Sequence, residues 1–303
     1  MWMRHVASRT FARAVAVCAL LCACAGAAGA QAQAGGGSGF AEVNGTRLYY
    51  EAAGKGPAVV LVHGGLNDSR LWDDQVRPLA QSFRVVRYDM RGFGKSAAPT
   101  GQFWPTEDLR ALLDFLKIEK ATVVGLSLGG IVAADFALEH PERVERLVFV
   151  GSGLRGDRQP PDEKSMAAYR ALAGEGPEKY FETFLKADLL AGLRERPQAR
   201  ARMRTLMLDN YKALTYLRSG LSQSPEPPTA ERLGKIKAPT LVVVGGLDSK
   251  NLLNIADTLA TGIPGARKVV IPGASHHPPV ETPQEFNRAL LDFLGTKAVT
   301  SDK

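Results

Sequence analysis

Two hydrophobic patterns alternate along most of the chain, from residue 40 to about residue 295. Short runs in which nearly every position is apolar are typical of strands buried on both faces, whereas apolar positions three and four residues apart are typical of packed helices. The runs predict strands over 58–62, 84–88, 122–125, 144–150, 240–244 and 268–271, and the periodic stretches predict helices over 71–81, 107–116, 128–139, 252–261 and 283–294. This alternation predicts an α/β fold, with a mostly parallel central sheet flanked by helices.

The beginning of this region has a different pattern. Two short segments, 40–43 and 47–51, flank Asn44-Gly45, a dipeptide that favours the tight turn of a β-hairpin. We therefore expect the sheet to begin with antiparallel strands.

An interruption of the alternation after strand 144–150 predicts a cap. Residues 154–234 contain helix-like stretches and no convincing strand. Ligands of open α/β sheets bind outside the carboxyl ends of the strands, so an insertion at this point would cover the ligand site. We predict an α/β core made of residues 40–153 and 235–303, with a helical cap over 154–234.

The first thirty residues have the layout of a signal peptide. Three arginines, Arg4, Arg9 and Arg13, lie at its start, and it contains no acidic residue. An apolar run over 14–25 follows, and small residues lead to Ala30. The apolar run is shorter than the roughly 20 residues that cross a bilayer. We expect residues 1–30 to be removed, a flexible Gly/Ala-rich tether over 31–39, no membrane span, and an exported protein, periplasmic or secreted.

All three cysteines, Cys18, Cys22 and Cys24, lie within this leader. The mature chain would then have no thiol, which excludes disulfides, cysteine nucleophiles and thiolate metal sites. Residues 21–24 loosely resemble a bacterial lipobox, so a lipid anchor at Cys24 is the alternative to cleavage after Ala30.

The composition is that of a soluble globular protein, with 45% hydrophobic and 23% charged residues. The formal charge of +7 includes three arginines of the leader, so the mature chain has 35 basic and 31 acidic residues and a charge of +4. Lysines and arginines are scattered rather than grouped with aromatic residues, which argues against a nucleic-acid partner.

A tight turn between a predicted strand and a predicted helix carries the first candidate for chemistry. Gly125-Leu126-Ser127-Leu128-Gly129 matches the G-x-S-x-G pattern of a nucleophile elbow, in the strand-turn-helix context that this motif requires. We predict Ser127 as the nucleophile. The backbone N–H of Leu128 is expected to bind the oxyanion, and Gly65, in the loop after strand 58–62, is expected to give the second donor.

A serine hydroxyl becomes a good nucleophile only when a base accepts its proton, and four histidines follow the leader. His63 ends a strand before two glycines, and His140 closes a helix, so we interpret both as structural. His276 and His277, which follow strand 268–271, are the remaining candidates for the base.

The third member of a catalytic triad is a carboxylate that orients the imidazole. Asp248 follows strand 240–244, and the order Ser, Asp, His suits the elbow motif. The competing position after strand 144–150 is occupied by Gly151-Ser152-Gly153, which offers no carboxylate. We therefore predict Asp248 as the acid of the triad.

Four segments match one known pattern. They are His63-Gly64-Gly65 with Trp72 downstream, the stretch 89–96, the elbow at 125–130, and the stretch from Gly273 through His276 to Pro283. Together they resemble the α/β-hydrolase superfamily over about residues 40–295, especially its capped, esterase-like members. The resemblance implies that the base lies five residues before a glutamate, which selects His276, with Glu281, over His277. It also implies that Gly65 and Leu128 form the oxyanion hole, and it has glycine where this chain has Ser275.

The resemblance implies a serine hydrolase that cleaves carboxylic ester or lactone bonds of a small organic substrate through an acyl-enzyme, with no cofactor and no metal. A carbon–carbon bond hydrolase of ring-fission diketones and a non-catalytic ligand-binding member of the fold are the alternatives. The substrate is not identified by the sequence. Candidate pocket residues in the cap are Met166, Tyr169, Tyr180, Phe181, Phe184 and Leu185.

Overall fold

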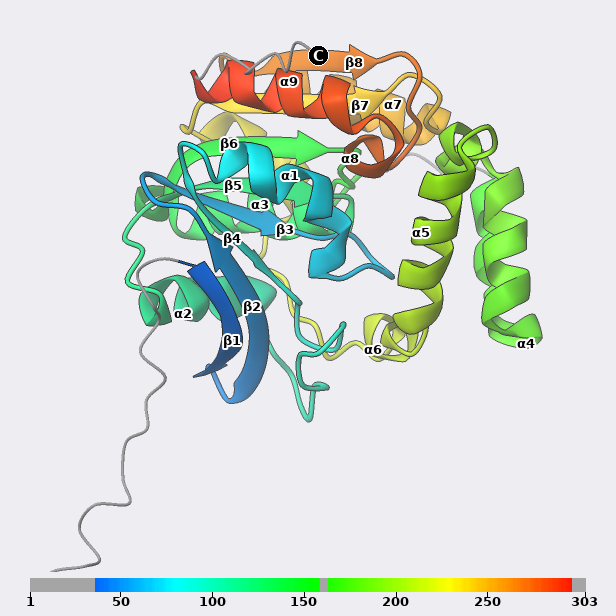
Figure 1. Ribbon diagram of the computed structural model, residues 1–303, viewed down its shortest axis with the longest axis horizontal. Coiled ribbons are helices and arrows are strands. Elements are labelled where there is room, and N and C mark those ends of the chain that lie inside the picture. The colour runs from blue at the N-terminus through cyan, green and yellow to red at the C-terminus, as the bar shows by residue number, and fades with distance from the viewer. Residues whose placement is uncertain (1–35, 159–162, 296–303) are drawn as a thin grey trace, which may run out of the picture. The chain divides into compact units, whose positions relative to one another are not determined.

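The computed structural model describes residues 36–158 and 163–295 (Figure 1). These residues form one eight-stranded sheet with the order β1-β2-β4-β3-β5-β6-β7-β8. The strands are β1 (Gly36–Val43), β2 (Thr46–Ala53), β3 (Ala58–Val62), β4 (Arg84–Tyr88), β5 (Ala121–Leu126), β6 (Val144–Val150), β7 (Thr240–Gly245) and β8 (Arg267–Ile271). The pairs β1·β2 and β2·β4 are antiparallel and the other pairs are parallel. The predicted α/β class, with a mostly parallel sheet and an antiparallel start, is confirmed.

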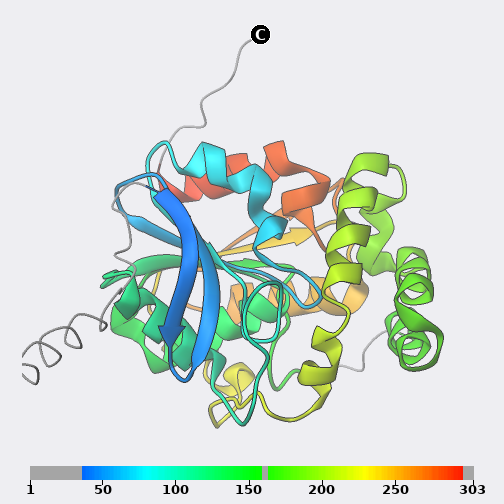
Figure 2. The same ribbon diagram turned by 60° about the horizontal axis from the view of Figure 1, so that its bottom comes forward.

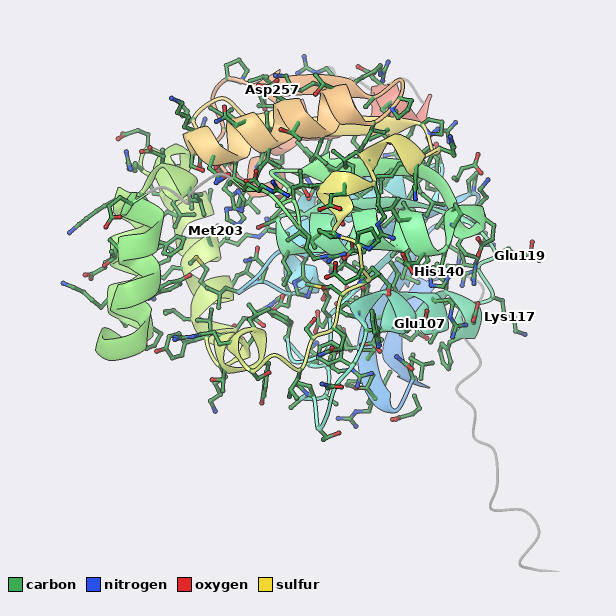
Figure 3. The ribbon with its side chains drawn as sticks, turned by 180° about the vertical axis from the view of Figure 1, so that it is seen from behind. Glu107, Lys117, Glu119, His140, Met203 and Asp257 are labelled. Atoms are coloured by element: carbon green, nitrogen blue, oxygen red, sulfur yellow. The ribbon has the colours of Figure 1, made fainter. Side chains whose placement is uncertain are left out.

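Helices cover both faces of this sheet. On one face α1 (Asp73–Leu79) contacts α9 (Pro283–Leu294), and on the other lie α2 (Pro105–Phe115), α3 (Leu128–Glu139) and α7 (Lys250–Gly262), as Figures 1 and 3 show from opposite sides. Strands β5 and β7 are buried at every position, which explains why their sequences are apolar except for Thr122 and Thr240.

The segment predicted as a cap is helical, and in its described part it adds no strand to the sheet. It contains α4 (Glu163–Lys186), the 3-10 helix η3 (Asp188–Leu193), α5 (Pro197–Asp209) and α6 (Ala213–Arg218), followed by two short 3-10 turns, η4 (Thr229–Glu231) and η5 (Leu233–Lys235). Figure 1 shows α4 and α5 beyond the carboxyl ends of the strands, in the direction in which the arrows of β3 and β6 point, and Figure 2 shows the same placement in a second view.

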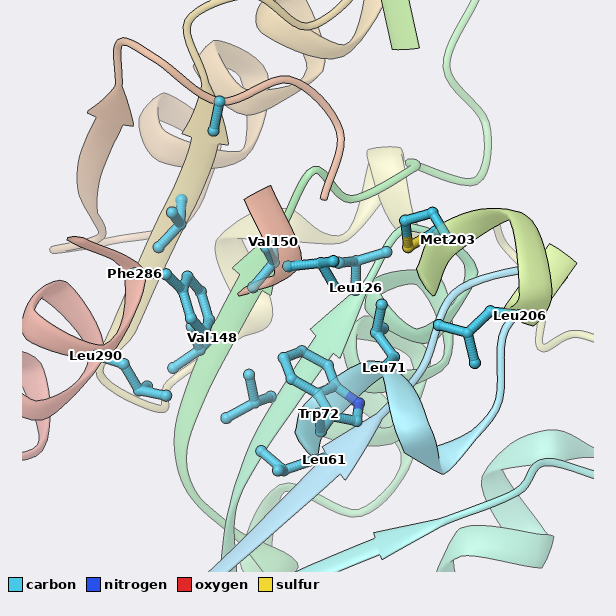
Figure 4. Close-up of a cluster of buried hydrophobic side chains, with 14 of the residues drawn as sticks. Leu61, Leu71, Trp72, Leu126, Val148, Val150, Met203, Leu206, Phe286 and Leu290 are labelled. Atoms are coloured by element: carbon cyan, nitrogen blue, oxygen red, sulfur yellow. The ribbon is translucent and has the colours of Figure 1, made fainter. Parts of the chain in front are cut away.

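Helix α5 of the cap shares its apolar core with the sheet. Met203 and Leu206 belong to the same buried cluster as Leu71, Trp72 and Leu126, and Figure 4 shows them side by side. A buried apolar side chain of this size stabilises the fold by about 1.5–3 kcal/mol. These contacts make α5 part of the apolar core.

A buried polar contact also ties the end of α5 to the core. The amide of Asn210 donates to a carboxylate oxygen of Asp68 at 2.8 Å, and its carbonyl oxygen accepts from the N–H of Gly94 at 2.8 Å. The hydrogen bonds from Arg70 and Asn210 outweigh burial and hold the pKa of Asp68 below its usual value, so this carboxylate stays charged.

One predicted boundary is wrong. The tether was expected over 31–39, but β1 begins at Gly36, and Gly36 to Gly39 pair with β2. A strand ladder is built from backbone groups, so glycines extend it even though they bring no side chains to a core. The predicted signal peptide, Cys24 and the rest of the tether lie outside the described residues. Within the described ranges, no helix has the length and apolar character needed to cross a membrane.

Candidate active site

Ser127 occupies the turn between β5 and α3 in a strained conformation. Its backbone angles are φ 54° and ψ −112°, a region that residues other than glycine rarely adopt. The turn is held by the N–H of Ser127, which donates to the carbonyl of Val150 at 3.0 Å. Such strain persists only where the surrounding structure holds the residue in place.

The glycines of the elbow are required by the close approach of neighbouring backbone. A Cβ atom on Gly125 would lie 2.2 Å from the carbonyl oxygen of Gly129, and one on Gly129 would lie 2.3 Å from that of Val62. Both distances are far below van der Waals contact. The G-x-S-x-G spacing therefore reflects the packing of α3 against the ends of β3 and β5.

His276 and Asp248 come together although 28 residues separate them. Nδ1 of His276 lies 3.1 Å from Oδ2 of Asp248, and both side chains are almost fully buried. The other carboxylate oxygen of Asp248 accepts the N–H of Ser249 at 2.8 Å. The carboxylate thus holds one nitrogen of the ring and leaves the other, Nε2, as the one that can exchange a proton with a substrate or a nucleophile.

A cavity of about 500 Å³ lies between the strand ends and the cap, and the predicted residues surround it. Ser127, His276, Gly65 and Leu128 all line it, and Asp248 sits behind His276. The structure therefore brings the predicted nucleophile, base, acid and both oxyanion-hole residues to one place. Most of the remaining wall is apolar and comes from the core and the cap: Leu66, Ile131, Leu154, Tyr180, Phe184, Leu189, Leu190, Met207, Leu214, Leu217, Leu252 and Ile255.

Asn67 is a cavity residue that the sequence pattern did not single out. Its amide nitrogen donates to the carbonyl oxygen of Gly65 at 2.9 Å, and the intervening Leu66 has a positive φ of 58°. This contact fixes the peptide that follows Gly65, so the loop expected to give an oxyanion donor is held in one conformation. Nothing in the sequence signalled this role, because Asn67 is the first of four consecutive polar residues, 67–70.

The two histidines interpreted as structural have structural partners. Nδ1 of His63 lies 2.7 Å from the carbonyl oxygen of Gly64, and Nε2 accepts the N–H of Met90 at 3.0 Å. Burial lowers the pKa of His63, which keeps the ring neutral. His140 pairs with Glu107 at 2.9 Å, and Figure 3 shows these two residues far from Met203 of the cap.

His277 packs its ring edge-on against His276, with ring centroids 4.9 Å apart. It lines the cavity, and within the described part of the chain its buried Nδ1 has no hydrogen-bond partner. Burial, and then the neighbouring His276, hold the pKa of His277 well below its ordinary value. His277 is therefore a neutral side chain in the wall of the cavity.

This neutral histidine predicts a loss of stability in mild acid. An imidazole in the unfolded chain takes up a proton near pH 6.5, whereas native His277 does not. As the pH falls below about 6.5, His277 should lower the free energy of unfolding by up to about 1.4 kcal/mol per pH unit. Urea unfolding at pH 7.5 and pH 5.5 measures this change, which should be smaller in His277→Gln. An equal change in both proteins would contradict the prediction.

Two of the six cap candidates, Tyr180 and Phe184, line the cavity. Phe181, which is buried in the same apolar cluster as these two, and Leu185, which packs against that cluster, are absent from the lining. The side chains of the other two candidates, Met166 and Tyr169, lie outside the described residues. Across the described ranges, no group of three or more His, Cys, Asp or Glu side chains is placed to hold a metal ion.

Comparison with known proteins gives a consistent picture. Residues 57–283 match the family model described as the alpha/beta hydrolase fold. The chain is 31% identical over 254 residues to the pimeloyl-[acyl-carrier protein] methyl ester esterase of Aeromonas hydrophila, which covers 81% of this chain and 98% of that protein. It is also 31% identical over 267 residues to the 2-hydroxy-6-oxo-6-phenylhexa-2,4-dienoate hydrolase of Comamonas testosteroni, with coverage of 82% and 91%.

Among solved structures, the enol-lactonase of Burkholderia xenovorans LB400 is similar to this chain with a TM-score of 0.73. It is 29% identical in sequence and covers 85% of this chain and 100% of its own. The similar proteins thus include hydrolases of esters, of lactones and of dienoates.

Proposed function

Because the chain belongs to the alpha/beta hydrolase family, we propose that it is a serine hydrolase that cleaves an ester or lactone bond of a small organic substrate through an acyl-enzyme. The observation that carries the proposal is the hydrogen bond between His276 and Asp248, at a cavity that Ser127 also lines. A nucleophile, a base and an orienting acid are the three parts that this chemistry requires.

In the proposed reaction, Oγ of Ser127 adds to the carbonyl carbon while its proton passes to Nε2 of His276. The backbone N–H groups of Gly65 and Leu128 bind the oxyanion that forms. The tetrahedral intermediate collapses, the bond to the leaving oxygen breaks, and His276 returns the proton to that oxygen. Water, deprotonated by the same imidazole, then releases the acid and restores Ser127. Asp248 stabilises the imidazolium during both acylation and deacylation of Ser127.

The direct test is the reactivity of Ser127 in the folded protein. We expect the protein without residues 1–30 to hydrolyse p-nitrophenyl butyrate and to be labelled on Ser127 by a fluorophosphonate, because both reactions require an activated serine. Peptide mass spectrometry locates the label. A folded protein that shows neither reaction would favour the non-catalytic, ligand-binding alternative.

The charge of the cavity predicts a preference for uncharged acyl groups. Among the lining residues that the structure describes, Asp157 is acidic, His277 is neutral, and none is lysine or arginine. Burying a carboxylate without a cationic partner costs several kcal/mol. We therefore expect kcat/KM for p-nitrophenyl butyrate to exceed that for mono-p-nitrophenyl succinate by at least about tenfold, which corresponds to about 1.4 kcal/mol.

The methyl ester of that succinate is the matched control for size. It should be hydrolysed at a rate close to that of the butyrate, because it has no charge. Similar values of kcat/KM for mono-p-nitrophenyl succinate and for its methyl ester would contradict the preference for uncharged acyl groups.

Carbon–carbon bond hydrolysis is the second candidate, because the Comamonas testosteroni relative is a hydrolase of a dienoate. A dienoate carries a carboxylate, so the charge of the lining favours the ester and lactone reading. Bleaching of a coloured ring-fission dienoate without turnover of p-nitrophenyl esters would favour carbon–carbon bond hydrolysis over ester hydrolysis.

We also propose that the protein is exported by a cleaved leader, on the basis of the charge and apolar pattern of residues 1–30. Sequencing the N-terminus of the protein from a periplasmic extract checks this, since cleavage should leave Gln31 first. A blocked terminus at Cys24 that carries lipid would favour the anchored form.

A further inference from the structure

The loop that carries His276 is joined to the cap by a buried serine. Ser275 is fully buried, and its Oγ accepts the N–H of Gly192, in η3 of the cap, at 3.0 Å. The same hydroxyl lies 2.9 Å from Oε1 of Glu281 and 3.1 Å from the carbonyl oxygen of Leu189, and it can donate its one proton to either. Ser275 therefore bridges a carboxylate of the core and the backbone of the cap, across 83 residues of sequence.

The same cap element also bonds to the backbone of His276. The N–H of His276 donates to the carbonyl of Leu189 at 3.2 Å. Leu189 and its neighbour Leu190 line the cavity. One short helix of the cap, η3, is thus both a wall of the substrate cavity and a hydrogen-bond partner of the residue proposed as the base.

The contact is a direct approach of backbone to carboxylate, with no space for a side chain. A Cβ atom on Gly192 would lie 1.8 Å from Oε2 of Glu281 and 2.9 Å from the backbone nitrogen of Ser275. Glu281 also accepts the N–H groups of Ser275, at 2.5 Å, and His277, at 2.8 Å. The carboxylate holds the loop on both sides of His276, and the hydroxyl of Ser275 extends this arrangement to the cap.

Asp248 and η3 control different properties of His276. Asp248 contacts Nδ1 and so orients the ring, whereas η3 and Ser275 hold the backbone from which the ring projects. A base acts only within hydrogen-bond reach of the proton that it accepts, and a displacement of about 1 Å can lower a rate about 100-fold. If the backbone were displaced, a correctly oriented ring would still lie outside hydrogen-bond reach of Ser127.

We propose that Ser275 is a positioning residue that couples η3 of the cap to His276, so that the cavity wall and the base are placed as one unit. The inference rests on the proposed function, since it assigns His276 the role of base. It explains why this chain has a hydroxyl at a position where the resemblance implies glycine: the hydroxyl reaches a cap backbone group that glycine cannot reach.

The test separates placement of the base from simple stability. Ser275→Ala, from the loop side, and Gly192→Ala, from the cap side, should each lower kcat for p-nitrophenyl butyrate about tenfold and leave KM within about twofold. The double variant should be little worse than Gly192→Ala alone, because the added methyl group already displaces the Glu281 carboxylate and separates Gly192 from Ser275. A kcat for Ser275→Ala equal to that of the unchanged protein, or losses that multiply in the double variant, would overturn the proposal.

Ser96→Ala is the matched control. Oγ of Ser96 accepts the N–H of Tyr49 and donates to the carbonyl of Asp89, so this variant also loses one accepted and one donated hydrogen bond, but away from the His276 loop. It should lower the melting temperature and leave kcat unchanged. An equal fall of kcat in Ser96→Ala would reduce Ser275 to a structural residue. If the unchanged protein neither turns over the ester nor takes the fluorophosphonate label, the proposed function itself has failed.

Discussion

Replacement of Ser127 by alanine is expected to lower kcat for p-nitrophenyl butyrate by at least about 10⁴-fold. The proposed acyl-enzyme requires a bond between the substrate and Oγ, and alanine has no atom there. The fold should persist, because alanine keeps the Cβ that already occupies this strained turn and the N–H that donates to Val150. Steady-state kinetics, together with far-ultraviolet circular dichroism, measure the two effects separately.

Ser152→Ala is the control for this experiment. Ser152 is a buried serine beside the elbow whose Oγ donates to the carbonyl of Gly153, and it does not line the cavity. Its replacement should change kcat by no more than a few-fold. Equal activity in Ser127→Ala and the unchanged protein would remove Ser127 from the mechanism.

Replacement of Asp248 by asparagine is expected to lower kcat about 10⁴-fold, with little change of shape. The N–H of Ser249 donates to Oδ1, so the carbonyl oxygen of the new amide should remain there and the NH₂ group should face Nδ1 of His276. An NH₂ group donates, so it favours the tautomer with its proton on Nε2. That tautomer cannot accept the proton of Ser127.

Asp135→Asn is the matched control, since Asp135 is also buried but binds Arg155 and Thr229. This variant should lose stability while its kcat stays within a few-fold. If Asp135→Asn lost as much activity as Asp248→Asn, the loss would follow from replacing any buried aspartate and would not support a specific role for Asp248. An unchanged kcat in Asp248→Asn would contradict the role proposed for this carboxylate.

Much of the fold follows from local sequence. The apolar runs of β5 and β7 predict buried parallel strands, and the Asn44-Gly45 turn predicts the hairpin that the structure contains. The family resemblance is likewise confirmed by the match over residues 57–283. The tether boundary was placed too late, because glycines in β1 have no side-chain pattern and pair only through their backbone.

The candidate site divides in the same way. Ser127 and its flanking glycines form one continuous motif, so the sequence alone specifies a strained turn that presents a serine. The roles of Ser127, His276, Asp248, Gly65 and Leu128 remain predictions, but their convergence on one cavity is a feature of the structure.

Tertiary structure alone revealed what holds these residues in place. Asn67 looks like an ordinary loop residue until its amide is seen to bond to Gly65. Ser275 meets Gly192 only because the cap folds back onto the His276 loop. Periodicity and motifs record the preferences of neighbouring residues, whereas such contacts depend on the packing of separate elements. Local sequence was therefore enough to identify the elbow that carries Ser127, and only the folded chain could show that the cap is joined to the loop of His276.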